Sequence, residues 1–515
     1  MKNALLILLL LTLCCFTKAQ SQFLDPSFNG TGYAIIELTP YNDRTCEVIV
    51  QPDGKILTSG LFQFFNTATG TDSITSFITR HHSDGSIDSS FNSAGIVYSD
   101  LRLADLASAN MELLEDGKIV IAGTKYLPDD GQMCVQKFNA DGSKDMSFGD
   151  SGEKLIVSPD GYYSSSNCLK VQPDGKIVAA GVSSGSLILA RLESNGEFDL
   201  SFGENGIVAI YEGYPYIFNI NFLSDGNIIV TGDSDSYQIS IMKFNPDGSA
   251  NTAFGINGKK LLKYNFQFEN HAYGLAIQQD DKIIVSGHSN GLWLLYRVNP
   301  IDGSLDNTFG TNGAVVNHFS NGTRDVATSV IEMSDNRILA TGRYKKDFND
   351  EKYNIVIVRY LSNGNMDSTF GINGMIEFDF EKREDQGKSS FIQPDGRIVC
   401  VGFSGNTEYT GNDMVILRCS GFSSVSTPEM ELKSSFTVFP NPAIENVNIN
   451  VTAPKAGMYS VSIQSINGIT IRNFRKVLNT GTNYLEIPLH DLPCGSYIIV
   501  IEGYAFFVSQ KLLVD

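Results

Sequence analysis

The chain has 515 residues, 42% of them hydrophobic and 18% charged, and a formal net charge of −19 at pH 7. A chain of this length can bury a large hydrophobic core. The negative charge argues against a nucleic-acid partner and against binding to an anionic membrane surface, because both need a basic face.

The N-terminal segment has the composition of a secretory signal peptide. An early lysine, Lys2, precedes an apolar run from Ala4 to Phe16, and small residues follow up to Ala19. The apolar run is too short to span a bilayer. We therefore expect residues 1–19 to be removed during export, and we expect no transmembrane segment in the mature protein.

A unit of 51 to 63 residues is then repeated seven times. Its first mark is a two-residue turn between apolar runs, and Asp-Gly at such a place is a strong hairpin signal because the turn needs positive φ. The seven turns are Asp53-Gly54, Asp116-Gly117, Asp174-Gly175, Asp225-Gly226, Asp280-Asp281, Asp335-Asn336 and Asp395-Gly396. Each turn leads into an apolar strand that ends on a glycine, at Gly60, Gly123, Gly181, Gly232, Gly287, Gly342 and Gly402.

The second half of each unit is equally regular. A basic residue closes the next strand, at Arg80, Lys137, Arg191, Lys243, Arg297, Arg359 and Arg418. A turn follows that contains an Asp or Asn, at Asp25, Asp88, Asp145, Asp199, Asn251, Asp306 and Asp367, and that ends on Phe28, Phe91, Phe148, Phe202, Phe254, Phe309 and Phe370. A residue that recurs at one place in a turn usually holds that turn together by capping or by an ion pair. We therefore expect a structural role for these charges and not a ring of binding residues.

Four short strands per unit at this period predict radially repeated sheets, as in a β-propeller. Strands such as KIVIAG are almost continuously apolar, which is typical of sheets covered on both faces. A β-solenoid is the alternative, although its coils are usually shorter. The chain begins with a lone fourth strand, Gly32–Leu38, and the repeats end on a third strand, Met414–Cys419. We predict an all-β fold with seven four-stranded blades over residues 20–420, in which the N-terminal strand closes the last blade.

The repeat stops after Cys419, and the composition of the chain changes. Residues 421–435 are rich in small and polar side chains, as in a linker. Residues 436–515 alternate apolar and polar side chains in NVNINV and YSVSIQ, with turns such as Asn467-Gly468 between them. This pattern predicts a separate small β-sandwich.

Two families resemble these regions. The segments QPDGKI, L-A-R and L-D-x-S-F-G resemble the delta-60 repeat family of secreted bacterial β-propellers over roughly residues 23–420. The C-terminal unit resembles the type A sorting domain of the type IX secretion system of the Bacteroidetes. The residues that carry this second resemblance, and so the expected sorting signal, include Pro440, Asn441, Pro442, Gly495, Tyr497, Lys511, Leu512 and Val514.

The resemblance implies a cellular location and one partner. The protein is expected to cross the inner membrane by the general export route and the outer membrane through the type IX machinery. The sorting domain would then be removed, and the product released or attached at the cell surface. Neither family has an assigned catalytic activity, so we expect no enzyme and no catalytic residues.

Motifs for metal or nucleophilic chemistry are weak. The six cysteines after the signal lack CxxC spacing, and no histidines have zinc-ligand spacing. Two G-x-S-x-G strings, around Ser183 and Ser289, lie in predicted loops between strands, whereas a nucleophile elbow leads into a helix. We expect no metal site and no cofactor. A structural Ca²⁺ in the Asp-rich loops is the one weak alternative, because Asp233-Ser-Asp235 lacks the later Gly and Glu of a calcium loop.

The loops between the second and third strands, and between successive blades, vary in length and chemistry, and binding residues tend to lie in such loops. Aromatic residues beside Asp, Asn and Glu suit stacking on sugars or a protein interface. The candidate ligand-binding residues are Tyr162, Tyr163, Tyr211, Tyr214, Tyr216, Phe266, Phe268 and Tyr344. The hypothesis is a secreted, non-catalytic binding or scaffold module for glycans or surface proteins. The alternative is a glycan hydrolase or lyase at the channel mouth, which needs paired carboxylates that the sequence does not reveal.

Overall fold

The computed structural model describes residues 22–39, 42–66, 71–103, 110–127, 131–213, 215–234, 236–264, 269–319, 324–345, 352–380, 384–405, 411–420, 436–453, 456–465, 470–503 and 506–514. The chain divides into two compact units, residues 1–421 and 422–515. All regular elements among the described residues are β-strands. The predicted signal segment and linker lie outside the described residues.

The described residues of the first unit form seven antiparallel sheets, which we call blades 1 to 7 in chain order. Blade 1 contains β2 (Asp43–Val50), β3 (Ile56–Asn66), β4 (Thr71–His81) and β5 (Ile96–Ser99), and blade 2 contains β6 (Leu101–Arg102), β7 (Met111–Leu113), β8 (Ile119–Tyr126), β9 (Gly131–Phe138) and β10 (Glu153–Ile156). Blade 3 contains β11 (Ser164–Val171), β12 (Ile177–Ser183), β13 (Ser186–Leu192) and β14 (Ile207–Tyr211), and blade 4 contains β15 (Tyr216–Phe222), β16 (Ile228–Asp233), β17 (Ile239–Phe244) and β18 (Lys259–Leu262).

The remaining blades follow the same order. Blade 5 contains β19 (Asn270–Ile277), β20 (Ile283–Ser289), β21 (Leu292–Val298) and β22 (Ala314–Asn317), and blade 6 contains β23 (Val326–Glu332), β24 (Ile338–Tyr344), β25 (Asn354–Tyr360) and β26 (Met375–Phe378). Blade 7 contains β27 (Glu384–Ile392), β28 (Ile398–Gly405), β29 (Asn412–Cys419) and β1 (Tyr33–Ile36).

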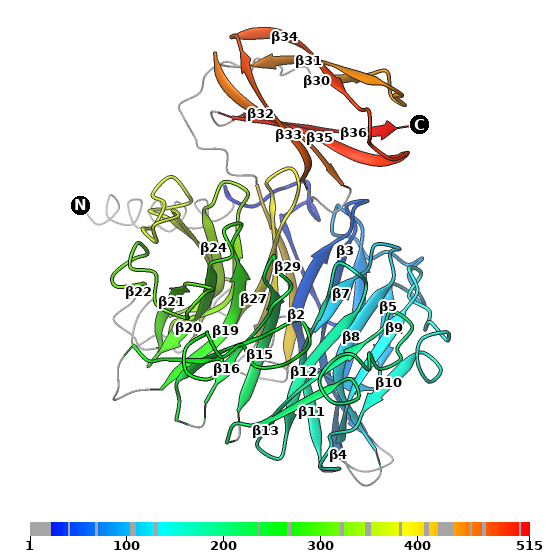
Figure 1. Cartoon of the computed structure of the whole chain (residues 1–515), viewed down its shortest axis with the longest axis vertical. Coiled ribbons are helices and arrows are strands. Elements are labelled where there is room, and N and C mark those ends of the chain that lie inside the picture. The colour runs from blue at the N-terminus through cyan, green and yellow to red at the C-terminus, as the bar shows by residue number, and fades with distance from the viewer. Residues whose placement is uncertain are drawn as a thin grey trace, which may run out of the picture. The chain divides into compact units, whose positions relative to one another are not determined.

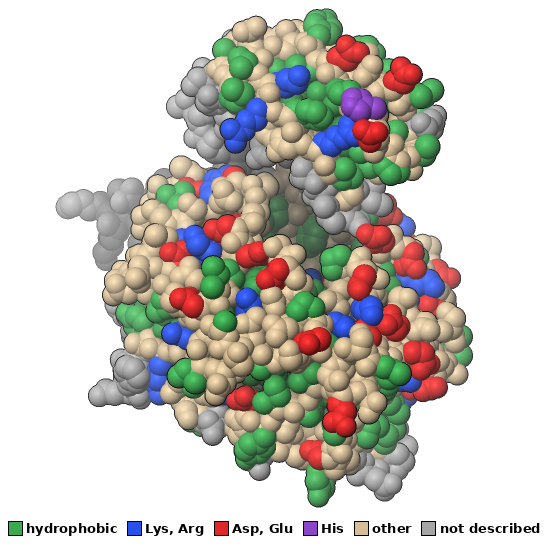
Figure 2. Space-filling model, viewed as in Figure 1, with side chains coloured by type: hydrophobic (Ala, Val, Ile, Leu, Met, Phe, Trp, Pro, Cys, Tyr) green, Lys and Arg blue, Asp and Glu red, His purple; other side chains and the backbone are tan. Residues whose placement is uncertain are grey.

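The blades form a closed ring. Each inner strand contacts that of the next blade, in the cyclic order β2, β7, β11, β15, β19, β23, β27 and back to β2. Figure 1 shows the first and last strands of the ring side by side, β2 and β3 in blue and β27 and β29 toward yellow. The predicted β-propeller class is thus confirmed. On the face in Figure 2, acidic side chains are spread among apolar and uncharged ones, and Lys and Arg are scattered between them.

The N-terminal strand closes the ring as predicted. β1 pairs antiparallel with β29, with Tyr33 opposite Leu417 and Ile36 opposite Met414. β1 is shorter than the predicted strand at both ends. Beside it, Arg418 Nε donates to Asp25 Oδ2 over 2.8 Å, and the Asp25 amide donates to the Arg418 carbonyl over 2.9 Å. Two segments almost 400 residues apart therefore share one sheet and one ion pair.

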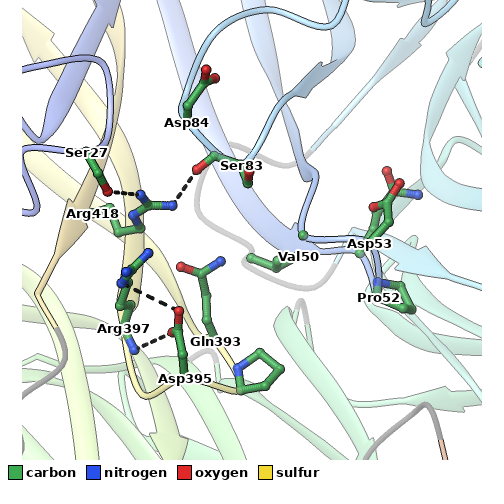
Figure 3. Close-up of a pocket in the computed structure, with 13 residues that line it drawn as sticks. Ser27, Val50, Pro52, Asp53, Ser83, Asp84, Gln393, Asp395, Arg397 and Arg418 are labelled. Carbon is green, nitrogen blue, oxygen red and sulfur yellow. Dashed lines mark hydrogen bonds and ion pairs between the residues drawn. The ribbon is translucent and has the colours of Figure 1, made fainter. Parts of the chain in front are cut away.

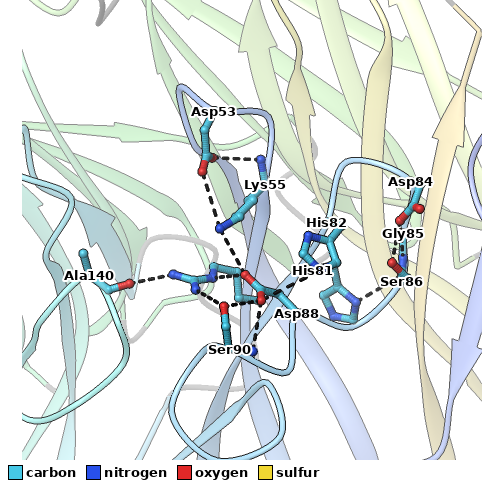
Figure 4. A network of polar contacts seen from close by, with 11 residues as sticks. Asp53, Lys55, His81, His82, Asp84, Gly85, Ser86, Asp88, Ser90 and Ala140 are labelled. Atoms are coloured by element: carbon cyan, nitrogen blue, oxygen red, sulfur yellow. Dashed lines mark hydrogen bonds and ion pairs between the residues drawn. The ribbon is translucent and has the colours of Figure 1, made fainter.

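The recurring basic residue links neighbouring blades, as blade 1 illustrates (Figure 4). Arg80 Nε donates to Asp88 Oδ2 over 2.8 Å, and Arg80 Nη1 donates to the carbonyl of Ala140 in the next blade over 2.6 Å. The guanidinium lies 4.5 Å from the centre of the Phe91 ring. Asp88 Oδ1 also accepts from the amide and hydroxyl of Ser90. The expected structural role of these charges is confirmed, because Asp88 caps its own turn and Arg80 binds both that aspartate and the next blade.

The glycine that ends each second strand has a steric cause. A Cβ on Gly232 would lie 1.8 Å from the carbonyl oxygen of Tyr216, because a β-bulge between Ile217 and Asn219 brings the inner strand close. Equivalent bulges occur in β2, β11, β19, β23 and β27. The glycines opposite them would clash with a backbone carbonyl at 1.8 to 2.3 Å, and they are Gly60, Gly181, Gly287, Gly342 and Gly402. Only glycine fits there without shifting the inner strand.

The hydrophobic cores lie between blades. Leu189 and Phe202 of blade 3, for example, pack in one cluster with Ile220 and Val230 of blade 4. The phenylalanine that ends the repeated turn is buried in all seven units. Both faces of most blades are therefore covered, which explains the almost continuous apolar strands in the sequence.

The second unit is the predicted β-sandwich. One sheet has the order β30 (Phe436–Phe439), β31 (Asn446–Ala453) and β34 (Gly481–Pro488). The other has the order β33 (Thr470–Leu478), β32 (Gly457–Ser465), β35 (Gly495–Gly503) and β36 (Phe506–Val514). Their inner faces share one core that includes Val447, Ile449, Tyr459 and Ile499.

Candidate functional site

Four of the predicted ligand-binding residues are exposed on the face of the propeller where the second strands end and the inner strands begin. Tyr162 and Tyr163 lie between β10 and β11, Tyr211 ends β14, and Tyr216 begins β15. Tyr211 has 72% of its surface exposed. We call this the variable face, because its loops differ from blade to blade.

The prediction for Tyr344 is wrong. This residue ends β24, its side chain is only 3% exposed, and its ring packs edge-on to Phe319 at a centroid distance of 6.3 Å. The strand continues further than the sequence pattern suggests, so Tyr344 joins the core between blades 5 and 6. Tyr214, Phe266 and Phe268 lie outside the described residues.

An exposed tyrosine that the sequence analysis missed pairs with a predicted one. The hydroxyls of Tyr126 and Tyr163 are 3.4 Å apart, and Arg102 Nη1 donates to the Tyr126 hydroxyl over 3.4 Å. A Cβ on Gly131 would lie 2.5 Å from the Tyr163 ring, so glycine makes room for that ring. Two aromatic rings from blade 2 and the following connection therefore stand together on the variable face.

A second aromatic cluster lies at the variable face where blades 4 and 5 meet. The His271 ring centre is 4.9 Å from that of His288 and 6.2 Å from that of Tyr237. Tyr273, the bulged residue of β19, stacks on both histidines and lies 5.1 Å from Phe218, the bulged residue of β15. The bulges thus bring aromatic side chains of two inner strands into contact.

An ion pair fixes this cluster. His271 Nδ1 lies 2.5 Å from Asp233 Oδ2, and the Ala272 amide donates to Asp233 Oδ1 over 3.0 Å. Burial opposes protonation of His271, but the hydrogen bond and charge of Asp233 outweigh it and raise the pKa of that histidine. Burial lowers the pKa of His288 to about 3, helped by the charges of His271 and Arg343. One histidine is therefore paired with a carboxylate, and its neighbour stays neutral.

Two depressions lie on the opposite face of the propeller, among the turns between the first and second strands. One, of about 490 Å³, lies between blades 7 and 1 and is lined by Asp53, Gln393, Arg397 and Arg418 (Figure 3). The other, of about 460 Å³, lies between blades 5 and 6 and contains the matching turn residues Gln278, Lys282 and Arg297. Because the same turn positions line both, each depression is a consequence of how neighbouring blades meet.

The two serines of the G-x-S-x-G strings lie at strand ends. Ser183 ends β12 and donates to Asp160 Oδ1 over 3.1 Å, while Ser289 ends β20 and is buried. Neither serine stands between a strand and a helix. Among the described residues, no three His, Cys, Asp or Glu side chains gather as metal ligands.

The expected sorting residues lie in two places of the sandwich. Pro440, Asn441 and Pro442 follow β30 and are exposed. Tyr497, two residues after Gly495 in β35, is buried, and its hydroxyl donates to the Pro493 carbonyl over 2.7 Å. Leu512 and Val514 point into the core, and Lys511 points outward.

Two family models match the chain. Residues 437–515 match the secretion system C-terminal sorting domain. Six segments, residues 51–91, 114–148, 172–202, 223–254, 278–309 and 334–370, match the β-propeller domain of unknown function DUF5122. The chain is a secreted β-propeller protein with a type IX sorting domain. Its sorting domain implies an interaction of the secreted propeller with the type IX secretion machinery. Among its described residues, no helix is long and apolar enough to cross a membrane.

Solved structures resemble the secreted propeller at low identity. Sqt1 from Chaetomium thermophilum, bound to the N-terminus of ribosomal protein L10, has 12% identity and a TM-score of 0.38, covering 75% of this chain and 98% of Sqt1. Prolyl oligopeptidase B from Galerina marginata has 10% identity and a TM-score of 0.37, covering 75% of this chain and 49% of the enzyme. The NanB sialidase from Streptococcus pneumoniae has 9% identity and a TM-score of 0.33, covering 68% of this chain and 71% of NanB. A search of curated proteins finds no match.

Proposed function

We propose that the secreted propeller is a non-catalytic recognition module and that its ligand is a glycan bound on the variable face. The observation that carries the proposal is a set of exposed tyrosines at strand ends of blades 2 to 4 and in the connection before β11. Those from the described residues are Tyr126, Tyr162, Tyr163, Tyr211 and Tyr216.

These tyrosines differ from the recurring residues of the scaffold. Residues equivalent to Arg80 and Asp88 occur in the other repeats. Arg80 and Asp88 are buried, and Arg80 contacts the next blade. The exposed tyrosines, in contrast, contribute little to any buried cluster. An aromatic ring with one open face can stack on the apolar face of a sugar, while its hydroxyl and nearby polar groups bind sugar hydroxyls.

The turn that carries Tyr162 is held in place by its own hydrogen bonds. Asp160 Oδ1 accepts from the Tyr162 amide over 3.1 Å and from the Ser183 hydroxyl over 3.1 Å. The Gly161 amide donates to the Ser158 carbonyl over 2.8 Å. A turn fixed before the ligand arrives loses less conformational entropy on binding.

A glycan array probed with the purified full chain tests the proposal. We expect selective binding that falls strongly when Tyr211 and Tyr216 are both changed to Ala. Tyr484→Ala is a matched control, because Tyr484 is 73% exposed but belongs to the sandwich. Silence of the folded chain across the array would contradict a glycan ligand and favour a surface protein. Shortened sugar products after incubation with bound glycans would contradict the non-catalytic role.

A further inference from the structure

One position of the repeat changes its chemistry in three consecutive blades. This position directly follows the recurring glycine of the second strand, on the side of the variable face. Four blades have an uncharged side chain here, at Leu61, Thr124, Val182 and Phe403. Blades 4, 5 and 6 have titratable or charged side chains instead, at Asp233, His288 and Arg343. The residues that hold the ring together recur from blade to blade, so a change confined to adjacent blades indicates a local function.

Two residues of the inner strand β19 join these positions. His271 lies opposite His288 in the pairing of β19 with β20, and the two ring centres are 4.9 Å apart. The Tyr273 ring stacks against the same His288 ring at a centroid distance of 5.9 Å. We call Tyr237, His271, Tyr273, His288 and Arg343 the blade 4–6 cluster, and every member is at least partly exposed.

Arg343 is a positive charge without a carboxylate partner among the described residues. Its Nη1 donates to Gln386 Oε1 of blade 7, and its guanidinium lies 4.7 Å from the centre of the Tyr353 ring. Its buried Nε has no hydrogen-bond partner there, and neither has its Nη2. Arg80 and Arg418, in contrast, each bind the aspartate of a repeated turn. A guanidinium that is held by neutral groups and remains partly exposed suits the binding of a ligand carboxylate.

Two neutral groups of the cluster are also donors without an acceptor in the described part of the chain. The Gly291 amide donates to His288 Nδ1 over 3.2 Å, so the neutral ring carries its proton on Nε2. Burial, together with the charge of Asp233, raises the pKa of Tyr273 to about 12, so its hydroxyl keeps its proton. His288 Nε2 and the Tyr273 hydroxyl can therefore both donate to a ligand. The charge of Arg343 acts on both residues, which places it near them.

Tyr237 lies beside this cluster in a strained backbone conformation. Its φ of 55° falls in a region that bulky residues rarely adopt, and it is the only aromatic residue there in the described ranges. Its carbonyl accepts from the Asn270 amide of blade 5 over 3.1 Å, which holds the loop against the next blade. The ring is 52% exposed and lies edge-on to His271. Strain of this kind is concentrated at ligand sites, where the surrounding contacts fix a side chain in the position that binding needs.

We propose that the blade 4–6 cluster binds the carboxylate of an acidic sugar, with Arg343, His288 and Tyr273 as the donors. Tyr237 supplies an exposed aromatic face for the sugar ring. The site adjoins the exposed tyrosines of the variable face, because Tyr216 begins the inner strand of blade 4, next to this cluster. This inference rests on the proposed glycan function and adds the class of sugar.

One exposed carboxylate competes with the ligand for the cluster. Glu269 Oε2 lies 3.6 Å from His271 Nε2, and the Glu269 side chain is 62% exposed. The buried carboxylate of Asp233 is already paired with the same histidine through Nδ1. Removing the charge of Glu269 should therefore strengthen the binding of an acidic sugar, whereas removing the charge of Arg343 should weaken it.

Calorimetric titration of the full chain with acidic oligosaccharides and their methyl esters tests the inference. The probes are oligosaccharides of galacturonic, glucuronic and N-acetylneuraminic acid, and the esters keep the sugar rings but lack the charge. We expect the wild type to bind one of the acids at least tenfold more tightly than its ester, as hydrogen bonds to a charged group allow. Arg343→Gln is expected to lose most of this preference. Arg337→Gln removes a partly exposed charge on the opposite face of the same blade and is expected to keep it.

Further variants keep the inference testable if Arg343→Gln fails to fold. Tyr273→Phe retains the ring and its packing and is expected to bind the acid roughly fivefold more weakly, with little change for the ester. Tyr98→Phe, which changes an exposed tyrosine of blade 1, is its control and is expected to bind like the wild type. Glu269→Gln is expected to bind the acid about two- to threefold more tightly.

The ratio of acid to ester affinity separates this inference from the proposed function. Tyr211→Ala/Tyr216→Ala is expected to weaken the binding of both forms and to leave their ratio unchanged. A ratio near one in a protein that binds sugars through these tyrosines would overturn this inference alone. An undiminished ratio in Arg343→Gln and Tyr273→Phe would overturn it as well. Silence of the folded chain toward both forms of every sugar would contradict the proposed function too.

Discussion

Glu47 lies where blades 1 and 2 meet, and its environment leads to a measurable pH effect. Its Oε2 accepts from the amides of Asn110 and Met111 at the start of β7, each over 2.8 Å. Burial, together with the charge of Glu112, raises the pKa of Glu47 from 4.5 to about 8. The folded protein therefore keeps a proton on Glu47 at neutral pH, whereas the unfolded chain releases it.

The sign and size of the effect follow from this difference. Above pH 4.5 the unfolded state loses the proton that the folded state holds, so this part of the stability falls as pH rises and levels off near pH 8. One pKa unit is worth about 1.4 kcal/mol, so between pH 4.5 and 7 the loss is about 3 kcal/mol. Glu47→Gln can keep an oxygen for the two amides but has no proton to release.

We therefore expect Glu47→Gln to match the wild type at pH 4 and to be about 3 kcal/mol more stable at pH 7. For a unit of this size, with an unfolding entropy of about 2 cal/mol/K per residue, that is roughly 3–4 °C in Tm. Calorimetry from pH 4 to 8 measures the difference. Glu193→Gln, which loses a partly exposed ion pair with Lys176 in blade 3 and does not touch Glu47, is the control. An unchanged difference between wild type and Glu47→Gln across pH would refute the reasoning.

Two further changes test the ring itself. Arg418→Ala leaves the buried Asp25 with only the partly exposed Arg397 as a counter-charge and should cost about 3 kcal/mol. Arg397→Ala removes the partly exposed contact to the same carboxylate and should cost under about 1 kcal/mol. Equal melting temperatures for the two variants would contradict the closure. Gly232→Ala should destabilise by roughly 3 kcal/mol or more because its Cβ meets the Tyr216 carbonyl, while Gly495→Ala, whose nearest neighbour is 3.6 Å away, should not. Normal melting of Gly232→Ala would show that the bulge relaxes easily.

Much of the propeller could be predicted because its information is local and repeated. Asp53-Gly54 and its equivalents mark hairpins, and the recurring pair of a basic residue and an Asp marks a turn that holds itself together. Because the chain begins with a fourth strand and ends the repeat with a third, the closure also follows from the order of elements. The antiparallel pairing of β1 with β29 is the closure that this order of strands predicts.

The features that the sequence does not predict depend on which strands lie next to each other in the fold. The clash at Gly232 is invisible without the bulge in the neighbouring strand, although the recurrence of glycine there was a signal. His271 and His288 are 17 positions apart in sequence but lie opposite each other in β19 and β20. Asp233 joins them from blade 4, so only superposing the repeats would have placed it beside them. The sequence predicts a loop at Tyr344 because charged residues follow it directly, but β24 extends to this residue.

We expect the variable face to bind a glycan through its exposed tyrosines. Calorimetric titration of the best array ligand into the wild type, Tyr211→Ala/Tyr216→Ala and Tyr484→Ala measures it most directly. We expect each lost stacking contact to cost about 1 kcal/mol, so that the double variant binds at least tenfold more weakly and Tyr484→Ala binds like the wild type. Equal affinities for all three proteins would place the ligand elsewhere and contradict the account.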